Sequence, residues 1–517
     1  MRRIDNPLNS NYSLTYKNRY ATMHHVFARR ASCSEKQQPD KRQTEMSVSY
    51  PAFLCSKEEC EMDFLNGKIK PIYFKYLSAA FGSAMITSVY SIVDTAMVGQ
   101  YQGPEGTAAL AVVAPVWNII YSLGLLMGIG GSVIFSTKRG RSATSGSENQ
   151  YFTSAVIGAV FLSILSWIGI IDLERPILTF FGADEALLIL AQEYMRPIKY
   201  VFPLFLFNQM LAAFLRNDED PGLATLGVLS GGIFNVFGDY FFVFTCDMGI
   251  YGAGLATAIG SGVSFLVMMT HFFRHKNTLR LVKPQKLFGK LREIFVTGFS
   301  TFFIDVAMGI LTVLFNRQIM KYLGANALAV YGPVIQVSTF VQCCAYSVGQ
   351  ASQPIISINF GAGKGERIKE TLRLSLLTTV FFGAFWTVLS MVCPNLYIRI
   401  FMAPTSEILA MAPAIVRTYA LSFLLLPFNI FSTYYFQAIM KPKAAFVVSV
   451  ARGLVISGIL IMILPLLFNA DSLWFAMPVT ELFVMIYAAA AIRKYTKALP
   501  TSVDYADAGH QKNGTRV

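Results

Sequence analysis

The chain has 517 residues, of which 54% are hydrophobic and only 14% are charged. Soluble domains carry about 25% charged residues, so this composition excludes an ordinary water-soluble protein. The formal net charge is +13. The basic residues are spread over short segments between apolar runs, which excludes a nucleic-acid-binding face on a polar domain.

Residues 1–61 differ from the rest of the chain because they are polar, mixed in charge and without a helical period. They also lack the apolar core of a secretory signal peptide. We predict that 1–61 is a disordered N-terminal extension. It is not translated at all if the protein starts at Met62 or Met46.

Apolar runs of about 20 residues recur along the remainder of the chain, long enough as helices to cross a ~30 Å hydrocarbon core. The runs are continuous rather than alternating, which favours helices over a membrane β-barrel. We therefore predict an all-α polytopic membrane protein. Its twelve transmembrane helices are expected at 71–98, 106–137, 150–172, 186–216, 220–245, 250–273, 289–321, 326–360, 368–393, 407–439, 443–468 and 472–493.

The basic residues indicate the topology of these helices. They gather in alternate connections, whereas the intervening connections are neutral, acidic or nearly uncharged, and an excess of Lys and Arg marks cytoplasmic loops. The pattern predicts a multi-pass protein of the cell (inner or plasma) membrane with both termini in the cytoplasm. The basic segments are 136–141, 271–293, 361–370, 441–443 and 493–497.

An internal repeat divides the chain into halves. The motif ALAVVAPV (109–116) recurs as ALAVYGPV (327–334), and FLRNDEDPGLA (214–224) has a counterpart in YFQAIMKPKAA (435–445). Because each half has six helices, an even number, both halves share one orientation and are related by an axis along the membrane normal. We predict two six-helix lobes related by a pseudo-two-fold axis. The expected domains are an N-lobe (62–273), a basic cytoplasmic linker (274–290), a C-lobe (291–497) and a disordered C-terminal tail (498–517). The simpler interpretation of the repeat is a duplicated structural bundle and not a transporter with a cleft between two lobes.

Two acidic residues lie inside apolar runs of the N-lobe. Counted from the outer helix ends, Asp94 is about five residues deep, Asp239 about six and Thr257 about seven. At ~1.5 Å rise per residue these depths agree within one helical turn. Asn235 lies one turn from Asp239 on the same helix face by its i, i+4 spacing.

These four side chains therefore predict a cluster of oxygen ligands of the kind that hard cations prefer. Two carboxylates at close range cannot both ionise cheaply, so one holds a proton or a cation lies between them. Na+ is thus a candidate metal at Asp94, Asn235, Asp239 and Thr257, and H+ is the alternative. The simpler interpretation is that the two aspartates only form interhelical hydrogen bonds, worth about 0.6 kcal/mol each in a membrane.

The C-lobe has its own charged residues near mid-depth. Arg452 and Glu481 are placed to form a buried pair between neighbouring helices, which we interpret as a structural ion pair. Asp305 then remains as a candidate contact for a coupling cation or a substrate.

The sequence resembles the multidrug and toxic compound extrusion (MATE) transporters, bacterial branch, over nearly all of 62–497. The matching stretches include VDTAMVGQYQG, FLRNDEDPGLA, GGIFNVFGDYFFVF and GAGLATAIG, in order across the predicted helices. The resemblance implies export of organic, often cationic, compounds in exchange for Na+ or H+. It also implies an N-lobe cation site, whose pattern falls on Asp94, Asn235, Asp239 and Thr257. The position of Ala253 matches one that offers a backbone oxygen.

We thus expect a secondary active antiporter with alternating access of two lobes, organic drug substrates and a surrounding lipid bilayer. A flippase for lipid-linked saccharides is the alternative, but it requires several basic residues in the cleft to hold a pyrophosphate. An enzyme is not expected, since the five histidines lie in tails or at loop edges. We expect a monomer without a cofactor other than the coupling Na+ or H+, and without nucleic acid.

Overall fold

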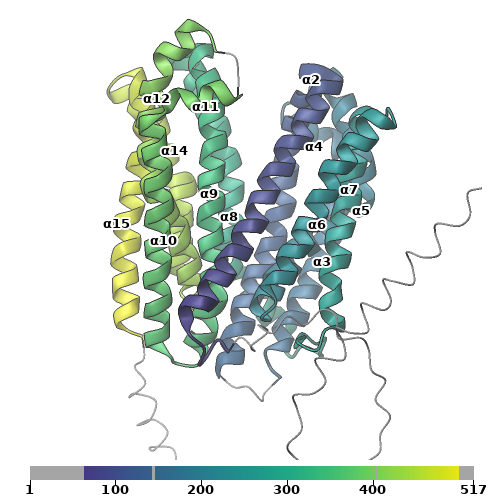
Figure 1. Cartoon of the computed structure of the whole chain (residues 1–517), viewed down its shortest axis with the longest axis vertical. Helices are drawn as coiled ribbons and strands as arrows, with labels where there is room; N and C mark the ends of the chain where they lie inside the picture. Colours follow the sequence, from purple (N-terminus) through teal and green to yellow (C-terminus); the bar gives the residue numbers. More distant parts are fainter. Residues whose placement is uncertain (1–62, 142–145, 402–403, 500–517) are drawn as a thin grey trace, which may run out of the picture. The chain divides into compact units, whose positions relative to one another are not determined.

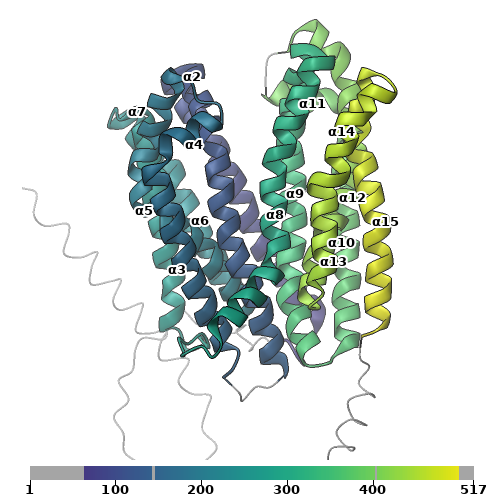
Figure 2. The same cartoon turned by 180° about the vertical axis from the view of Figure 1, so that it is seen from behind.

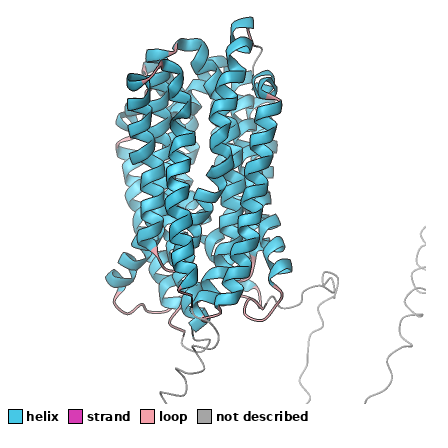
Figure 3. Cartoon of the chain, turned by 90° about the vertical axis from the view of Figure 1, so that its left-hand side faces the viewer, coloured by secondary structure: helices cyan, strands magenta, loops and turns pink. Residues whose placement is uncertain are grey.

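A computed structural model describes residues 63–141, 146–401 and 404–499. The predicted N-terminal extension and almost all of the predicted C-terminal tail lie outside these ranges. Within them the regular elements are helices, as Figure 3 shows. The predicted all-α class is confirmed.

The helices follow the predicted spans closely. Both of the first two predicted spans lie within α2, which is broken at Gly103, where the backbone is not helical (φ 72°, ψ −157°) and Pro104 follows. In the described part of the chain, the eleven long apolar helices therefore contain twelve crossings. The elements are α2 (Ile69–Arg141), α3 (Asn149–Asp172), α4 (Glu174–Phe180), α5 (Glu185–Asn217), α6 (Pro221–Asp239), η1 (Tyr240–Thr245), α7 (Gly249–Met269), η2 (Thr270–Phe273), α8 (Leu287–Tyr322), α9 (Gly324–Gly361), α10 (Gly365–Val392), α11 (Pro394–Phe401), α12 (Ser406–Ala438), α13 (Pro442–Val450), η3 (Ala451–Val455), α14 (Ile456–Leu467), η4 (Ala470–Phe475) and α15 (Ala476–Lys497).

Two short helices were not predicted. The helix α4 follows the third crossing of the first half, and α11 follows the third crossing of the second half. Pro394 is the first residue of α11 and Pro176 the third residue of α4, and proline is tolerated in the first turn of a helix. Both helices are too short to cross a bilayer. They occupy equivalent positions in the two halves, which identifies them as part of the repeat.

The described helices form two bundles, each with its own hydrophobic core. One core is built mainly from α2, α3, α5, α6 and α7, and the other mainly from α8, α9, α12 and η4. Figures 1 and 2 show these bundles from opposite sides, with α3–α7 in one and α8–α15 in the other. The helix α2 contacts both sets, since it packs against α5, α8 and α9.

The two bundles meet along the half that carries the basic helix ends. Tyr73 donates a hydrogen bond to Thr378 (3.0 Å), Phe81 stacks on Phe382 with 5.8 Å between ring centroids, and Ser88 contacts the Cys343 sulfur (3.1 Å). At the end of α9 the backbones themselves touch, because a Cβ added to Gly361 would lie 2.0 Å from the Thr137 carbonyl oxygen. Only glycine permits so close an approach. We call this contact of Gly361 with Thr137 the interlobe seam.

A polar network fixes the turn between α5 and α6 to the basic end of the N-lobe. The buried carboxylate of Asp218 accepts hydrogen bonds from Arg139 (3.0 Å) and from the backbone (2.9 Å) and hydroxyl of Thr278, and contacts His271 (2.7 Å). Burial alone would raise the pKa of Asp220, but its hydrogen bond with His271 and the charge of Arg274 hold that pKa below its usual value. Through Asp218, these contacts connect Thr278, which follows η2, to the ends of α2 and α5.

Candidate functional site

The N-lobe acids are brought together by three different helices. The first half of α2 carries Asp94, the end of α6 carries Asn235 and Asp239, and α7 carries Thr257. Directly after Asp239 the helix changes to the π-helical segment η1. π-Helical segments are rare in proteins, and many of those that occur lie at functional sites.

Hydrogen bonds connect the predicted residues of α6 and α7. The Asn235 amide donates to Thr257 Oγ1 (3.1 Å) and, at 3.4 Å, to Asp239 Oδ1. Asp94 and Asp239 lie close enough for their charges to interact. The structure thus places both aspartates, the amide and the hydroxyl in one cluster, which we call the N-lobe polar cluster.

Tyr194 on α5 completes this cluster. Its hydroxyl donates to Asp94 Oδ2 (3.0 Å). The helix α7 approaches α5 closely here, because a Cβ on Gly254 would lie 2.1 Å from the Tyr194 carbonyl oxygen. Sequence reasoning missed Tyr194, since a tyrosine in an apolar helix is common. Its depth in its helix, similar to that of the acids, was the one available signal.

Three oxygens of the N-lobe polar cluster are buried and have no hydrogen-bond partner. They are Asp94 Oδ1, Asn235 Oδ1 and Asp239 Oδ2. An unpaired buried polar atom costs about 1–3 kcal/mol, and more when charged. All three oxygens are acceptors, so they are satisfied by a hydrogen-bond donor such as water, by a proton or by a cation. The donor set therefore fits a hard cation or H+.

This set differs from that of a transition-metal site. Among the described residues, no three His, Cys, Asp or Glu side chains gather to hold a metal ion. Two carboxylates with an amide and a hydroxyl suit weakly bound hard ions. Ala253 is fully buried one helical turn before Thr257. No contact between described residues links its carbonyl oxygen to the aspartates.

If the N-lobe polar cluster holds a coupling cation, Tyr194→Phe is expected to lower the cation concentration for half-maximal transport about tenfold. The Tyr194 hydroxyl stabilises the ionised, cation-free form of Asp94, since a hydrogen bond to a charged group is worth ~1.5–3 kcal/mol. Asp94 would lose its only described donor, so a bound cation or proton becomes more favourable. Cation dependence of transport in reconstituted vesicles measures this change. Tyr200→Phe, on the same helix but 78% exposed, is the control. An unchanged cation dependence in Tyr194→Phe would contradict the role of the hydroxyl.

In the C-lobe, Asp305 stands apart from the other two predicted residues. It accepts a hydrogen bond from Tyr346 of α9 (3.1 Å), and Tyr346 in turn packs edge-on against Tyr434, with 6.4 Å between ring centroids. The Tyr434 hydroxyl is buried without a partner among the described residues. Asp305 thus lies in an aromatic environment, which differs from the oxygen-rich N-lobe polar cluster.

Arg452 and Glu481 form the expected contact, and a third residue joins them. Arg452 Nε donates to Glu481 Oε1 (2.8 Å), and both side chains are almost completely buried. The Asn429 amide donates to Glu481 Oε2 (2.6 Å) and to the Glu481 carbonyl oxygen (2.8 Å). Arg452 lies in the π-helical segment η3, so the fifth crossing of each lobe has such a segment at its buried charged residue.

Two helical bundles with buried polar clusters and twelve crossings define a two-lobe membrane transporter. The MatE family model matches residues 79–241 and again 299–463, one match in each lobe. The chain therefore belongs to the MatE family of multidrug and toxic compound extrusion transporters, and its bacterial relatives place it in the bacterial branch. The double match also confirms the internal repeat.

Similar proteins and structures agree with this assignment. The chain is 25% identical over 382 residues to the multidrug export protein MepA of Staphylococcus saprophyticus, covering 73% of this chain and 83% of that protein. Identity to MepA of Staphylococcus haemolyticus is 23% over 396 residues, or 76% and 84% of the two chains. An outward-facing multidrug resistance MATE transporter has the same fold, with a TM-score of 0.78 and 20% identity over 84% of this chain and 98% of that one. A transporter from Pyrococcus furiosus is equally similar in fold, with a TM-score of 0.78 and 19% identity.

Proposed function

We propose that this protein exports organic, often cationic, compounds in exchange for Na+ or H+ that binds at the N-lobe polar cluster. The observation that carries this proposal is the set of three unpartnered buried oxygens on Asp94, Asn235 and Asp239. The multidrug export function of the staphylococcal relatives supports the substrate class.

The cluster is suited to coupling because its occupancy changes the forces between helices. Without a cation or proton, Asp94 on α2 and Asp239 on α6 repel each other, and like charges at short range cost several kcal/mol in a low dielectric. With one bound, the same residues draw α2, α6 and α7 together. Because α2 also packs against α8 and α9 of the C-lobe, a shift of α2 would be transmitted to the contact between lobes. A movement of the two lobes relative to each other, driven by the shift of α2, would open the protein to one side of the membrane and then to the other, which is alternating access.

Asp305 is a second candidate for the coupling ion or for a cationic substrate. Its carboxylate accepts a hydrogen bond from Tyr346. Aromatic faces near a carboxylate suit an organic cation, since both attract positive charge. Asp305 would then hold the substrate while the N-lobe polar cluster holds the ion.

A flippase for lipid-linked saccharides is less well supported. Such a protein has to hold a pyrophosphate, which favours several unpaired basic residues in the bundle interior. Within the described residues the buried arginines are Arg216 and Arg452. The charge of Arg452 is already compensated by Glu481.

Transport into reconstituted vesicles tests the proposal. A fluorescent organic cation is placed outside, and a sodium gradient or a pH gradient is imposed separately. We expect accumulation driven by one of the two gradients and abolished by Asp239→Asn, with Asp172→Asn at an exposed helix end as the control. Accumulation that neither gradient drives would overturn the coupling.

A further inference from the structure

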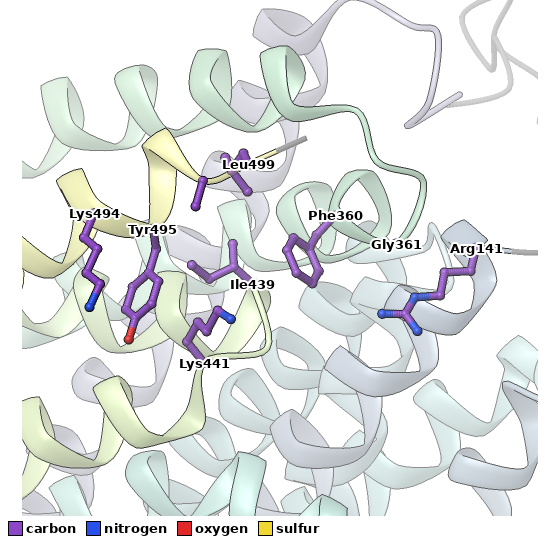
Figure 4. A pocket seen from close by; sticks show the side chains of 9 residues that line it. Arg141, Phe360, Gly361, Ile439, Lys441, Lys494, Tyr495 and Leu499 are labelled. Atoms are coloured by element: carbon purple, nitrogen blue, oxygen red, sulfur yellow. The ribbon is translucent and has the colours of Figure 1, made fainter. Parts of the chain in front are cut away.

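A cavity of about 670 Å³ lies at the basic ends of the helices, away from the N-lobe polar cluster. It is formed by the end of α2, the end of α9, the turn between α12 and α13, and the end of α15. Figure 4 shows Arg141 on one side and Lys494 with Tyr495 on the other, with Lys441 and Phe360 between them. By the positive-inside pattern, these helix ends face the cytoplasm.

The charge of the cavity lining is entirely positive. Three of the nine lining residues are basic, namely Arg141, Lys441 and Lys494, and none is acidic. None of the three forms an ion pair with a described residue. Lys441 is held in place instead by the ring of Tyr495, with 5.4 Å between its Nζ and the ring centroid. Three unneutralised cations around one cavity attract an anion.

The remaining lining is apolar, which restricts the kind of anion. Phe360, Ile439 and Leu499 contribute hydrocarbon surface next to the basic groups. A small hydrated anion gains nothing from such surface, whereas an amphiphile with a phosphate headgroup contacts both parts. Basic pockets on the cytoplasmic side of transmembrane helices suit the headgroups of anionic lipids.

We propose that this cavity binds the phosphate headgroup of an anionic phospholipid from the cytoplasmic leaflet. Arg141 and the lysines contact the phosphate, and the apolar residues contact the glycerol and the first carbons of the acyl chains. The planar guanidinium of Arg141 is suited to bidentate contact with phosphate oxygens.

The cavity also lies at the contact between lobes. Arg141 ends α2, four residues after Thr137 of the interlobe seam, and Gly361 of the seam is itself a lining residue. The other basic residues belong to the C-lobe helices. A bound headgroup therefore bridges the two lobes and stabilises the closed seam. This second step rests on the proposed alternating access, whereas headgroup binding does not.

Calorimetric titration of the purified full chain in neutral detergent tests binding. The probes are dihexanoyl phosphatidylglycerol, dihexanoyl phosphatidylcholine and inorganic phosphate. Each basic residue near a charged headgroup contributes ~1 kcal/mol, which is about fivefold in affinity. The triple variant Arg141→Gln, Lys441→Gln, Lys494→Gln is expected to bind phosphatidylglycerol about 100-fold more weakly.

A matched variant controls for general charge. Lys443→Gln, Arg493→Gln, Lys497→Gln removes three positive charges from the ends of α13 and α15, outside the cavity lining, and it should bind phosphatidylglycerol like the wild type. Weak or absent binding of inorganic phosphate supports a lipid, whereas phosphate binding as tight as that of the lipid would overturn a lipid ligand. Equal losses in both triple variants, or equal binding of phosphatidylcholine, would overturn the site.

Vesicle composition tests the bridging step. Transport by the wild type and by the control variant should slow when phosphatidylglycerol replaces phosphatidylcholine, since the closed seam is stabilised. The cavity variant should be insensitive to the change. If no form of the protein transports, the proposed function fails while the binding titration still decides the site. If all three forms respond alike, the bridging step is wrong.

Discussion

The Asp94→Asn variant is expected to reach the membrane at normal levels and to export at least tenfold less drug. An amide carries no charge and neither binds nor releases a proton at physiological pH, so the N-lobe polar cluster loses half of its negative charge. The fold should be retained, because the amide oxygen still accepts the hydrogen bond from Tyr194. In the proposed mechanism, the substitution therefore removes the exchange of Na+ or H+ and leaves the fold intact.

Drug susceptibility in an export-deficient host measures this effect, with membrane levels determined in parallel. Asp172→Asn is the control, since it makes the same chemical change at an exposed position at the end of α3. Normal export by Asp94→Asn at normal membrane levels would exclude the N-lobe polar cluster as the coupling site. Reduced export by Asp172→Asn as well would indicate a general charge effect.

Arg452→Met is expected to destabilise the protein by ~3–5 kcal/mol, because removing one partner leaves a buried charge uncompensated. Glu481 would remain fully buried with only Asn429 as a described side-chain donor. Thermal unfolding in detergent measures the loss as a lower midpoint at a fixed heating rate. The change should be larger than that of any exposed substitution on the same helices.

A double variant separates the ion pair from simple packing. Arg452→Met with Glu481→Gln removes both charges and should recover most of the lost stability, since a neutral pair of similar volume is often as stable as a buried ion pair. Arg493→Met, at an exposed position on α15, is the control and should unfold like the wild type. If the double variant is no more stable than Arg452→Met, the charge is not the cause.

The positions of the crossings could be read from the sequence because the bilayer sets a fixed length for each apolar run. Asp94, Asp239, Arg452 and Glu481 were visible for a related reason, since a charge within such a run is costly and therefore rare. The i, i+4 spacing of Asn235 and Asp239 placed them on one face, and the structure has them in hydrogen-bond contact. These are properties of single helices.

Tyr194, Asn429 and Tyr346 were missed because neutral polar residues are frequent in membrane helices and give no signal of their own. Their roles depend on which helix is the neighbour, as Tyr194 on α5 reaches Asp94 on α2 across 100 positions of sequence. The same holds for the basic cavity, whose Arg141, Phe360, Lys441 and Lys494 come from four separate helix ends.

The sequence by itself determined the membrane-spanning helices, their repeat and the charged residues within them, since these follow from local hydrophobicity and spacing. Only the tertiary structure decided which oxygens remain unpartnered, which tyrosine completes the cluster and where the two lobes touch. The physical reason is that hydrogen bonding and close backbone contact depend on distances between helices. Those distances are set by the packing of all the side chains together. The close contact of Gly361 with Thr137 at the seam is an example.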